Sequence, residues 1–306
     1  MKTVFVFPGQ GSQFVGMGKS LAATFPAAQR VFERADEALG YSLSKLCFEG
    51  PEEQLRQTEF TQPALVAVST AAFAVLEENG FLPDLVGGHS LGEYSALVAA
   101  GSLTLEDALR IVRNRGRYMQ DAVPQGVGAM AAILKMPEDA LPGVLAEAAQ
   151  GEVVSAANLN SPDQIVIAGH AGAVGRAMEL ATAAGARRVK LLPVSAPFHC
   201  ALMRPAQERL APELNATEFR ELRFPLINNY AATEIHTGAE ARKGLYEQIP
   251  NPVRWTESVR AMHGDRYVEV GAGNVLSGLI KQILPGASTQ RFGEAAEFDA
   301  VKTFLA

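Results

Sequence analysis

The segment Gly88-His89-Ser90-Leu91-Gly92 constrains the fold of this chain more than any other part of the sequence. It follows a short strand candidate, 84–87, and opens an alanine-rich stretch with helical spacing, 91–100. A serine between two glycines in that setting is typical of a sharp strand-to-helix turn, because glycine lets neighbouring backbone approach closely. The pattern predicts Ser90 as a nucleophile and the Leu91 N–H as an oxyanion donor. The alternative is a tight turn in which Ser90 only caps the helix.

Strand and helix patterns alternate on both sides of this turn. Lys2–Phe7 is a mostly apolar run, which indicates a strand buried on both faces. Strands that alternate with helices indicate a mainly parallel sheet with helices on both faces. Further strands are expected at 224–228 and 267–270, and further helices at 27–39, 62–79, 105–121, 200–215, 239–248, 252–262 and 274–283.

The middle of the chain has a different order of elements. Strands are expected at 128–134, 152–158, 164–168 and 187–192, with helices at 137–150 and 171–184. This β-α-β-β-α-β order is the split βαβ arrangement of a ferredoxin-like unit. The sequence therefore predicts an α/β fold in which residues 1–123 and 196–306 form a large domain and residues 124–195 a small inserted domain.

Composition excludes several classes of protein. The net charge of −6 argues against a nucleic-acid partner, since no basic excess is available to neutralise phosphates. Two cysteines, Cys47 and Cys200, are too few for a disulfide scaffold. No run of about 18 consecutive apolar residues predicts a membrane span. We expect a cytoplasmic protein with no membrane contact.

A serine hydroxyl needs a general base, and the chain has five histidines. His199 is the best placed, because it follows the small domain directly and lies where the two domains would meet. An ordinary histidine at a helix start is the alternative. The third member of the group stays open: Asp163 lies between Ser90 and His199 in the chain but in a loop of the small domain, and a backbone or amide oxygen could orient the imidazole instead.

Several motifs in this order resemble one family. They are Val6-Phe7-Pro8-Gly9-Gln10-Gly11-Ser12-Gln13, Gly88-His89-Ser90-Leu91-Gly92-Glu93-Tyr94, Arg115-Gly116 before Tyr118-Met119-Gln120, Asn158-Leu159-Asn160-Ser161-Pro162, Phe198-His199, Gln248 before Asn251-Pro252-Val253-Arg254-Trp255, and Glu269-Val270-Gly271-Ala272-Gly273. The chain resembles the malonyl-CoA:acyl carrier protein transacylases of fatty-acid synthesis and the acyltransferase domains of polyketide synthases. The likeness spans the whole chain.

The resemblance implies an α/β-hydrolase-like large domain with a ferredoxin-like insert, and a ping-pong transfer of malonyl from malonyl-CoA to the phosphopantetheine thiol of acyl carrier protein. It also implies roles for single residues: Ser90 carries the acyl group, His199 is base and then acid, Gln248 orients His199 through its carbonyl, and Gln10 holds the oxyanion with Leu91. Arg115 would grip the malonyl carboxylate, since its planar fork matches two carboxylate oxygens. Substrate contacts are expected from Met119, Phe198 and Asn160 as well. Malonyl-CoA is the expected substrate, and neither a metal nor a bound cofactor is expected.

Phe198 departs from many bacterial transacylases, which have a small residue before the histidine. A ring there resembles the malonyl-selective acyltransferase domains, so we predict malonyl over methylmalonyl. Two rival functions stay open: a serine hydrolase such as a thioesterase, which would use the same Ser90 and His199, and a catalytically silent scaffold. A dinucleotide site is disfavoured, because Phe14 stands where the third glycine of a G-x-G-x-x-G pattern belongs.

Overall fold

The computed structural model of the chain describes residues 1–194 and 196–306. Ser195, the last residue of the predicted insert, therefore lies outside the described residues. The helices of the large part are α1 (Lys19–Thr24), α2 (Pro26–Leu39), α3 (Leu43–Glu49), α4 (Glu52–Leu55), α5 (Thr58–Glu78), α6 (Gly92–Ala99), α7 (Leu105–Asp121), α10 (Arg204–Ala216), α11 (Gly238–Gln248), α12 (Trp255–Met262), α13 (Val275–Ile283) and α14 (Phe298–Leu305).

The large sheet is built around strand β1 (Thr3–Phe7), which is buried along its whole length. Its partners are β2 (Leu85–Gly88), β7 (Leu226–Ile227), β8 (Glu234–Ile235), β9 (Arg266–Val270) and β10 (Ser288–Phe292). Within the described residues the strand order is β10-β9-β1-β2-β7-β8. All neighbours in it are parallel except β7 and β8, which pair antiparallel. The predicted mainly parallel sheet is confirmed.

The two faces of β1 pack against different helices, as the period of two in a strand requires. Val4 and Val6 share a core with residues of α12 and α13, including Trp255. Phe5 and Phe7 face the larger core, where both rings pack edge-on against Phe73 of α5. The apolar run at 3–7 is therefore a strand covered by helices on both faces.

Helix α5 crosses the middle of this larger core. By length and composition alone it could cross a membrane, but 78% of its most apolar window is buried inside the molecule. Because neighbouring helices α2 and α7 cover it, its apolar character is that of a core helix.

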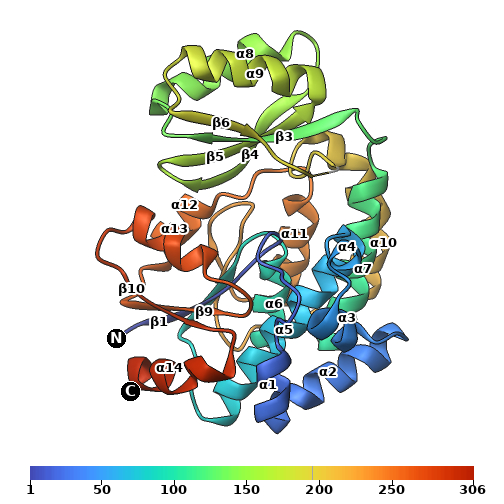
Figure 1. The fold of residues 1–306 in the computed structure, drawn as a ribbon, viewed down its shortest axis with the longest axis vertical. Helices are drawn as coiled ribbons and strands as arrows, with labels where there is room; N and C mark the ends of the chain where they lie inside the picture. The colour runs from blue at the N-terminus through green and yellow to red at the C-terminus, as the bar shows by residue number, and fades with distance from the viewer. Residues whose placement is uncertain (195) are drawn as a thin grey trace.

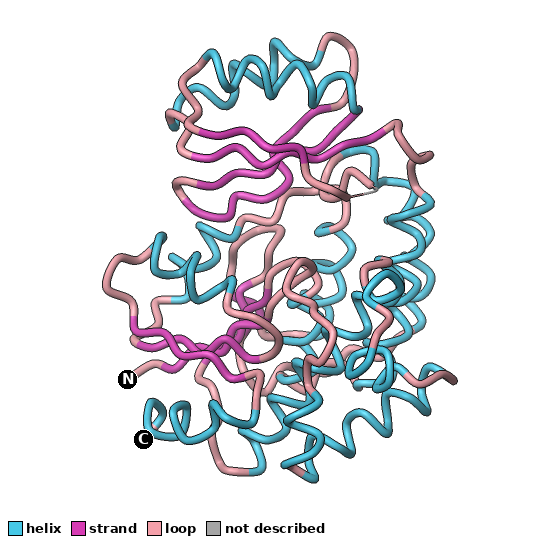
Figure 2. Tube along the Cα trace, in the orientation of Figure 1, coloured by secondary structure: helices cyan, strands magenta, loops and turns pink. Residues whose placement is uncertain are grey.

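The small sheet stands apart from the large one, at the top of Figures 1 and 2. It consists of β3 (Gly128–Leu134), β4 (Val154–Ser161), β5 (Gln164–His170) and β6 (Arg188–Leu191), in the order β4-β5-β3-β6. Helices α8 (Leu141–Ala149) and α9 (Ala171–Ala183) cover its outer face (Figure 1). Each helix connects two strands that are separated in the sheet by one antiparallel strand, which is the predicted split βαβ arrangement. The domain limits at 123/124 and 195/196 stay a prediction.

Strand β4 joins the two parts. Asn158 forms a parallel bridge with Val253, whose N–H donates to Ala157 O and whose carbonyl accepts from Leu159 N–H, both at 2.9 Å. These bonds hold Val253 in a β-bridge, so α12 begins at Trp255 and not at Pro252 as predicted. The bridge fixes the small sheet against the region that follows α11.

Several short elements were not expected from the sequence: α1, α3, α4, β8, β10 and α14. Strand β10 has the sequence STQRF, which lacks an apolar run because it is an edge strand of mostly half-exposed and exposed residues. The predicted strand 224–228 is reduced to two residues, since Asn228 already turns into a loop held by its own side chain. None of these differences alters the sheet order around Ser90.

Candidate active site

The predicted strand-to-helix turn positions Ser90 between β2 and α6. Ser90 has φ +51°, in the left-handed region. A residue other than glycine is rarely found there unless the surrounding structure enforces it. A Cβ on Gly88 would lie 2.0 Å from the Gly92 carbonyl, and a Cβ on Gly92 would lie 2.0 Å from Phe7 O. Both glycines are therefore required by the close approach of α6 to β1 and β2.

His199, which is 109 positions away in the chain, lies next to Ser90. The two residues are brought together with 2.7 Å between Ser90 Oγ and His199 Nε2. The His199 Nδ1–H donates to the backbone carbonyl of Gln248 at 3.0 Å. That bond selects the tautomer with a free lone pair on Nε2, ready to accept the serine proton. The orienting group is thus a backbone oxygen, whereas Asp163 is exposed and lies near Lys135.

The electrostatics keep this imidazole neutral. Burial, and secondly the Arg115 guanidinium, lower the pKa of His199 to about 3. A neutral imidazole with a free Nε2 is the form that a general base needs.

Gln10 and Leu91, the predicted oxyanion donors, line the same pocket as Ser90. Gly9 packs closely on the strand-to-helix turn at residues 88–92, called the elbow below: a Cβ on Gly9 would lie 2.4 Å from His89 O. This contact brings Gln10 to the same pocket as Ser90. Within the part of the chain that the structure describes, the backbone N–H groups of Gln10 and Leu91 have no hydrogen-bond partner. Two unpaired amides near a serine hydroxyl suit a developing oxyanion.

Arg115 reaches the serine from α7. Its side chain is buried, and Nη2 donates to Ser90 Oγ at 3.2 Å and to Gln248 Oε1 at 2.9 Å. Nη1 donates to Gln62 Oε1 at 3.0 Å, and Cζ lies 5.5 Å from the centroid of the Tyr94 ring. Burial lowers the pKa of Arg115, but a guanidinium remains charged at neutral pH. The pocket therefore holds a fixed positive charge next to its nucleophile.

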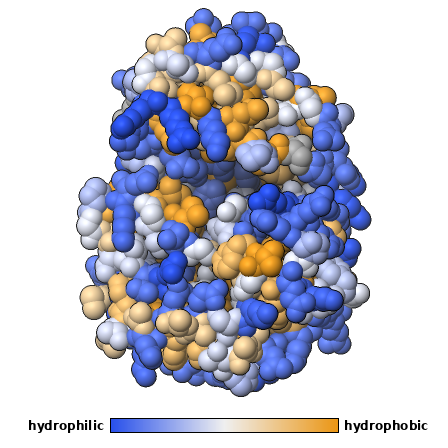
Figure 3. All heavy atoms as spheres, in the orientation of Figure 1, coloured by the Kyte–Doolittle hydropathy of each residue, from blue (hydrophilic) through white to orange (hydrophobic). Residues whose placement is uncertain are grey.

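These groups open into one pocket of about 500 Å³ between the two parts of the molecule. The space-filling view is hollowed below the small sheet (Figure 3). The predicted residues that line the pocket are Gln10, Ser90, Leu91, Arg115, Met119, Phe198 and His199. Apolar side chains from the part that carries the small sheet, such as Met130 and Leu192, line it as well. The cavity thus combines a serine, a base, a cation and an apolar wall.

Asn160 is not brought to this pocket. Its Oδ1 is 2.8 Å from His89 Nε2, in a contact that links β4 to the elbow, and Asn158 lines the pocket in its place. The contact has a physical reason: alternate residues of a strand point the same way, but the bridge between Asn158 and Val253 and the irregular pairing of β4 turn Asn160 towards His89.

A buried polar network that the sequence did not point to lies behind the elbow. Asn229 Oδ1 accepts from Ser90 N–H and Asn229 Nδ2 donates to Gly88 O, both at 2.6 Å. Glu93 Oε2 accepts from the Asn229 N–H at 3.0 Å and from Gln248 Nε2 at 2.8 Å. Burial raises the pKa of Glu93 to about 7, although both of these donors and Arg115 favour the carboxylate. Glu93 and Gln248 stood in motifs of the sequence, but nothing in the sequence pointed to Asn229 or to the contacts among the three.

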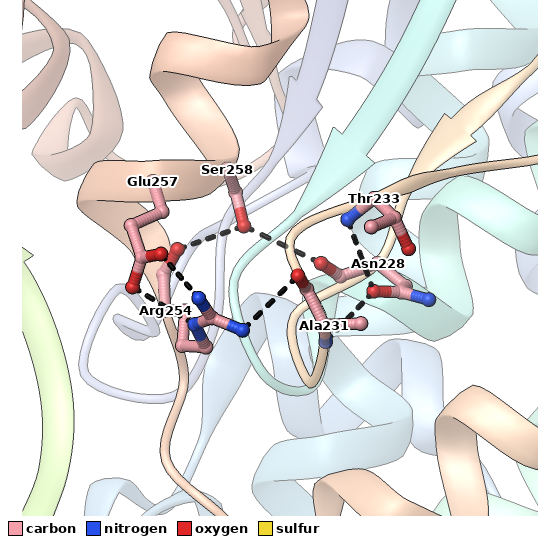
Figure 4. A network of polar contacts seen from close by, with 6 residues as sticks. All are labelled: Asn228, Ala231, Thr233, Arg254, Glu257 and Ser258. Atoms are coloured by element: carbon pink, nitrogen blue, oxygen red, sulfur yellow. Dashed lines mark hydrogen bonds and ion pairs between the residues drawn. The ribbon is translucent and has the colours of Figure 1, made fainter.

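A second network keeps the loop of Asn229 in place (Figure 4). Asn228 Oδ1 accepts from the Ala231 N–H, and the Ser258 hydroxyl donates to Asn228 O. Arg254, paired with Glu257, donates to Ala231 O at 3.1 Å. The loop is thereby held against the start of α12, so Asn229 has a fixed support under the serine.

The chain is similar over nearly its whole length to known acyl transferases. A family profile described as "Acyl transferase domain" matches residues 4–282. The malonyl CoA-acyl carrier protein transacylase of Escherichia coli is 46% identical over 300 residues, which are 97% of this chain and 97% of that protein. An acyl carrier protein S-malonyltransferase structure from Vibrio cholerae has a TM-score of 0.96 at 46% identity and covers 98% of this chain and 100% of its own. A malonyl-transacylase solved in complex with a type II polyketide synthase acyl-carrier protein has a TM-score of 0.96 at 44% identity, over 99% of this chain and 100% of that chain.

Proposed function

The chain belongs to the acyl transferase domain family, and from that premise we propose how its pocket performs the transfer. The activity is that of a malonyl-CoA:acyl carrier protein S-malonyltransferase, with malonyl-CoA as substrate and acyl carrier protein as partner. It supplies malonyl units to fatty-acid synthesis. The roles of single residues below are our proposal.

In the first half-reaction Ser90 becomes acylated. His199 Nε2 takes the hydroxyl proton while Ser90 Oγ attacks the thioester carbonyl of malonyl-CoA. The resulting oxyanion accepts hydrogen bonds from the Leu91 and Gln10 N–H groups. The tetrahedral intermediate collapses, the carbon–sulfur bond breaks, and the CoA thiolate leaves with the proton from His199. The 2.7 Å contact between Ser90 Oγ and His199 Nε2 carries this assignment.

The second half-reaction is the reverse with a different thiol. The phosphopantetheine thiol of acyl carrier protein gives its proton to His199 and attacks the Ser90 ester. The ester bond breaks, and Ser90 recovers its proton from His199. No metal and no bound cofactor enters either step.

Arg115 selects the cargo in this proposal. Its Nη2 lies 3.2 Å from Ser90 Oγ, which places a guanidinium fork within reach of a carboxylate on a short acyl group bound there. Phe198 and Met119 supply an apolar wall that packs on the methylene and crowds an α-methyl branch. Asn160 acts on this site only through His89, not by contact with substrate.

We propose in addition that the fold divides into a catalytic domain, 1–123 and 196–306, and a small domain, 124–195, that forms the upper wall of the pocket. A cytoplasmic location is proposed as well, since malonyl-CoA and the carrier protein are the reactants.

Intact-mass spectrometry tests the assignment of the nucleophile. The protein is mixed with malonyl-CoA without carrier protein, and the wild type is expected to gain one malonyl group that is lost again when carrier protein is added. Ser90→Ala is expected to gain none. Ser95→Ala is the matched control: Ser95 is a buried serine outside the pocket on α6, the helix that follows Ser90, and this variant is expected to acylate normally.

Two results would contradict the proposal. A malonyl group that still appears on Ser90→Ala would exclude Ser90 as the nucleophile. CoA release that proceeds by hydrolysis alone, without transfer to added carrier protein, would favour the thioesterase alternative.

A further inference from the structure

Glu93 is a titratable side chain inside the core that takes no direct part in the proposed transfer. It is fully buried on the second residue of α6, and its backbone N–H donates to Ser90 O at 3.1 Å. Charged residues are seldom fully buried unless a partner compensates them. Its partners show what the carboxyl group holds.

One oxygen of Glu93 binds two donors that support different catalytic groups. Oε2 accepts from the Asn229 N–H at 3.0 Å, and the Asn229 side chain in turn binds the Ser90 N–H at 2.6 Å. Oε2 also accepts from Gln248 Nε2 at 2.8 Å. Within the described residues, Oε1 has no hydrogen-bond partner.

Gln248, which Glu93 holds, forms hydrogen bonds with His199 and with Arg115, the two groups next to Ser90 Oγ. Its backbone carbonyl accepts from His199 Nδ1–H at 3.0 Å, and its side-chain Oε1 accepts from Arg115 Nη2 at 2.9 Å. Its Nε2 donates to Ser90 O at 3.1 Å besides Glu93. A displaced Gln248 would therefore disturb the imidazole and the guanidinium together.

We propose that Glu93 is a positioning residue for malonyl transfer: through Asn229 and Gln248, its Oε2 fixes the relative placement of Ser90, His199 and Arg115. The inference rests on the proposed roles of those three residues. It predicts that the hydrogen-bond reach of the side chain matters more than its negative charge, because one oxygen accepts both bonds.

Two conservative variants separate reach from charge. Glu93→Gln keeps the length and one acceptor oxygen for both donors but removes the charge. Glu93→Asp keeps the charge but withdraws the oxygens by about 1.5 Å, the length of one carbon–carbon bond, which takes both donors beyond hydrogen-bond range. If the charge beside Arg115 were the functional feature, Glu93→Asp would be the better enzyme. If the positioning of Asn229 and Gln248 is the functional feature, Glu93→Gln would be the better enzyme.

The assay measures kcat and KM for malonyl-CoA at saturating carrier protein, the malonyl-to-acetyl preference, and Tm. We expect Glu93→Asp to lose about tenfold to 10²-fold in kcat, the scale of a 1 Å misplacement of reacting groups. Its malonyl preference should narrow as well, because Arg115 is displaced with Gln248. Glu93→Gln should keep most of the wild-type kcat and the full wild-type malonyl-to-acetyl preference. Its Tm should be lower than that of the wild type, because its NH₂ replaces the unpartnered Oε1.

Glu269→Asp is the matched control. Glu269 is also fully buried, and its two oxygens accept from the Leu276 and Ser277 N–H groups at the start of α13, away from the pocket. Shortening it should lower Tm and leave kcat and the acyl preference as in the wild type. A merely structural role of Glu93 would give the same result for Glu93→Asp.

The outcomes are distinct. The proposal is overturned if folded Glu93→Asp has wild-type kcat and preference, or if Glu93→Gln loses as much as Glu93→Asp. Should Glu93→Asp not fold, a tenfold loss of kcat in folded Glu93→Gln would overturn it alone. A wild-type protein that never gains a malonyl group on Ser90 would refute the proposed nucleophile instead, so the two failures can be told apart.

Discussion

Replacement of Arg115 by alanine tests the charge that we assign to cargo selection. The guanidinium is buried, and its Nη2 lies 3.2 Å from Ser90 Oγ, so malonyl on the serine would place its carboxylate against this group. Arg115→Ala would leave that carboxylate buried without a partner. Breaking one half of a buried ion pair costs about 3–5 kcal/mol.

That cost converts into a large change in specificity. Since about 1.4 kcal/mol is a factor of ten in rate, kcat/KM for malonyl-CoA should fall by about 10²- to about 4 × 10³-fold. An acetyl group has no carboxylate, so its kcat/KM should change far less. The malonyl-to-acetyl ratio is the decisive quantity.

Competition between malonyl-CoA and acetyl-CoA, followed by intact-mass detection of the acyl-enzyme, measures the ratio directly. Arg117→Ala is the matched control: Arg117 is exposed on the same helix, and its guanidinium contacts Asn114 and the Tyr118 ring outside the pocket. Tm is recorded for both variants, because Gln62 and Gln248 each lose a donor in Arg115→Ala.

An unchanged malonyl-to-acetyl ratio in Arg115→Ala would refute the carboxylate clamp. An equal loss for both acyl groups would refute it too, and would assign Arg115 to the support of Ser90 and Gln248 alone.

Two further predictions concern pH and the acyl branch. Because the pKa of His199 is lowered to about 3 in the folded protein, against an ordinary value of 6.5, its base form persists through pH 5, and the acid limb of kcat/KM for acylation should lie well below pH 6.5. The same shift sets the pH dependence of the free energy of unfolding. Between pH 6.5 and 3 the unfolded chain binds a proton at His199 and the folded protein does not, so the folded state becomes less stable as pH drops through this range. An acid limb near 6.5 in a stopped-flow pH series would contradict the shift. Phe198→Ala should narrow the preference for malonyl-CoA over methylmalonyl-CoA by about tenfold or more, the worth of one methyl group in a tight pocket, and an unchanged preference would show that the ring does not limit the branch.

The local part of the site was predictable from the sequence. The serine turn is encoded by adjacent residues, because the glycines at 88 and 92 and the flanking strand and helix are all within one short segment. His199 could be chosen by its place next to the end of the small domain. The mainly parallel sheet followed from the alternation of apolar runs and helical patterns.

The support behind the site was not predictable in the same way. Asn229 reaches Ser90 across 139 positions of the chain, and Gln248 reaches Glu93 across 155. No local pattern encodes such a pair, since each partner depends on how β7, α6 and α11 meet in space. Asn160 is a residue that the motif singled out as a substrate contact, but the pairing of β4 directs its side chain to His89. Its placement also depends on tertiary structure that no local pattern encodes.

The neutral side chain of Gln248 suits the charge of the pocket. Gln248 Oε1 lies 2.9 Å from Arg115 Nη2, so a carboxylate in its place would form a buried ion pair with Arg115. Malonyl would then have to compete with that carboxylate for Arg115, which would weaken the proposed selection. Gln248 instead keeps the Glu93 carboxyl one amide away from the guanidinium, and the Gln248 carbonyl orients His199 without adding charge. In the proposed complex, a malonyl carboxylate on Arg115 would offset the second cause of the lowered pKa of His199, which acts after burial, so the base would strengthen when malonyl is bound.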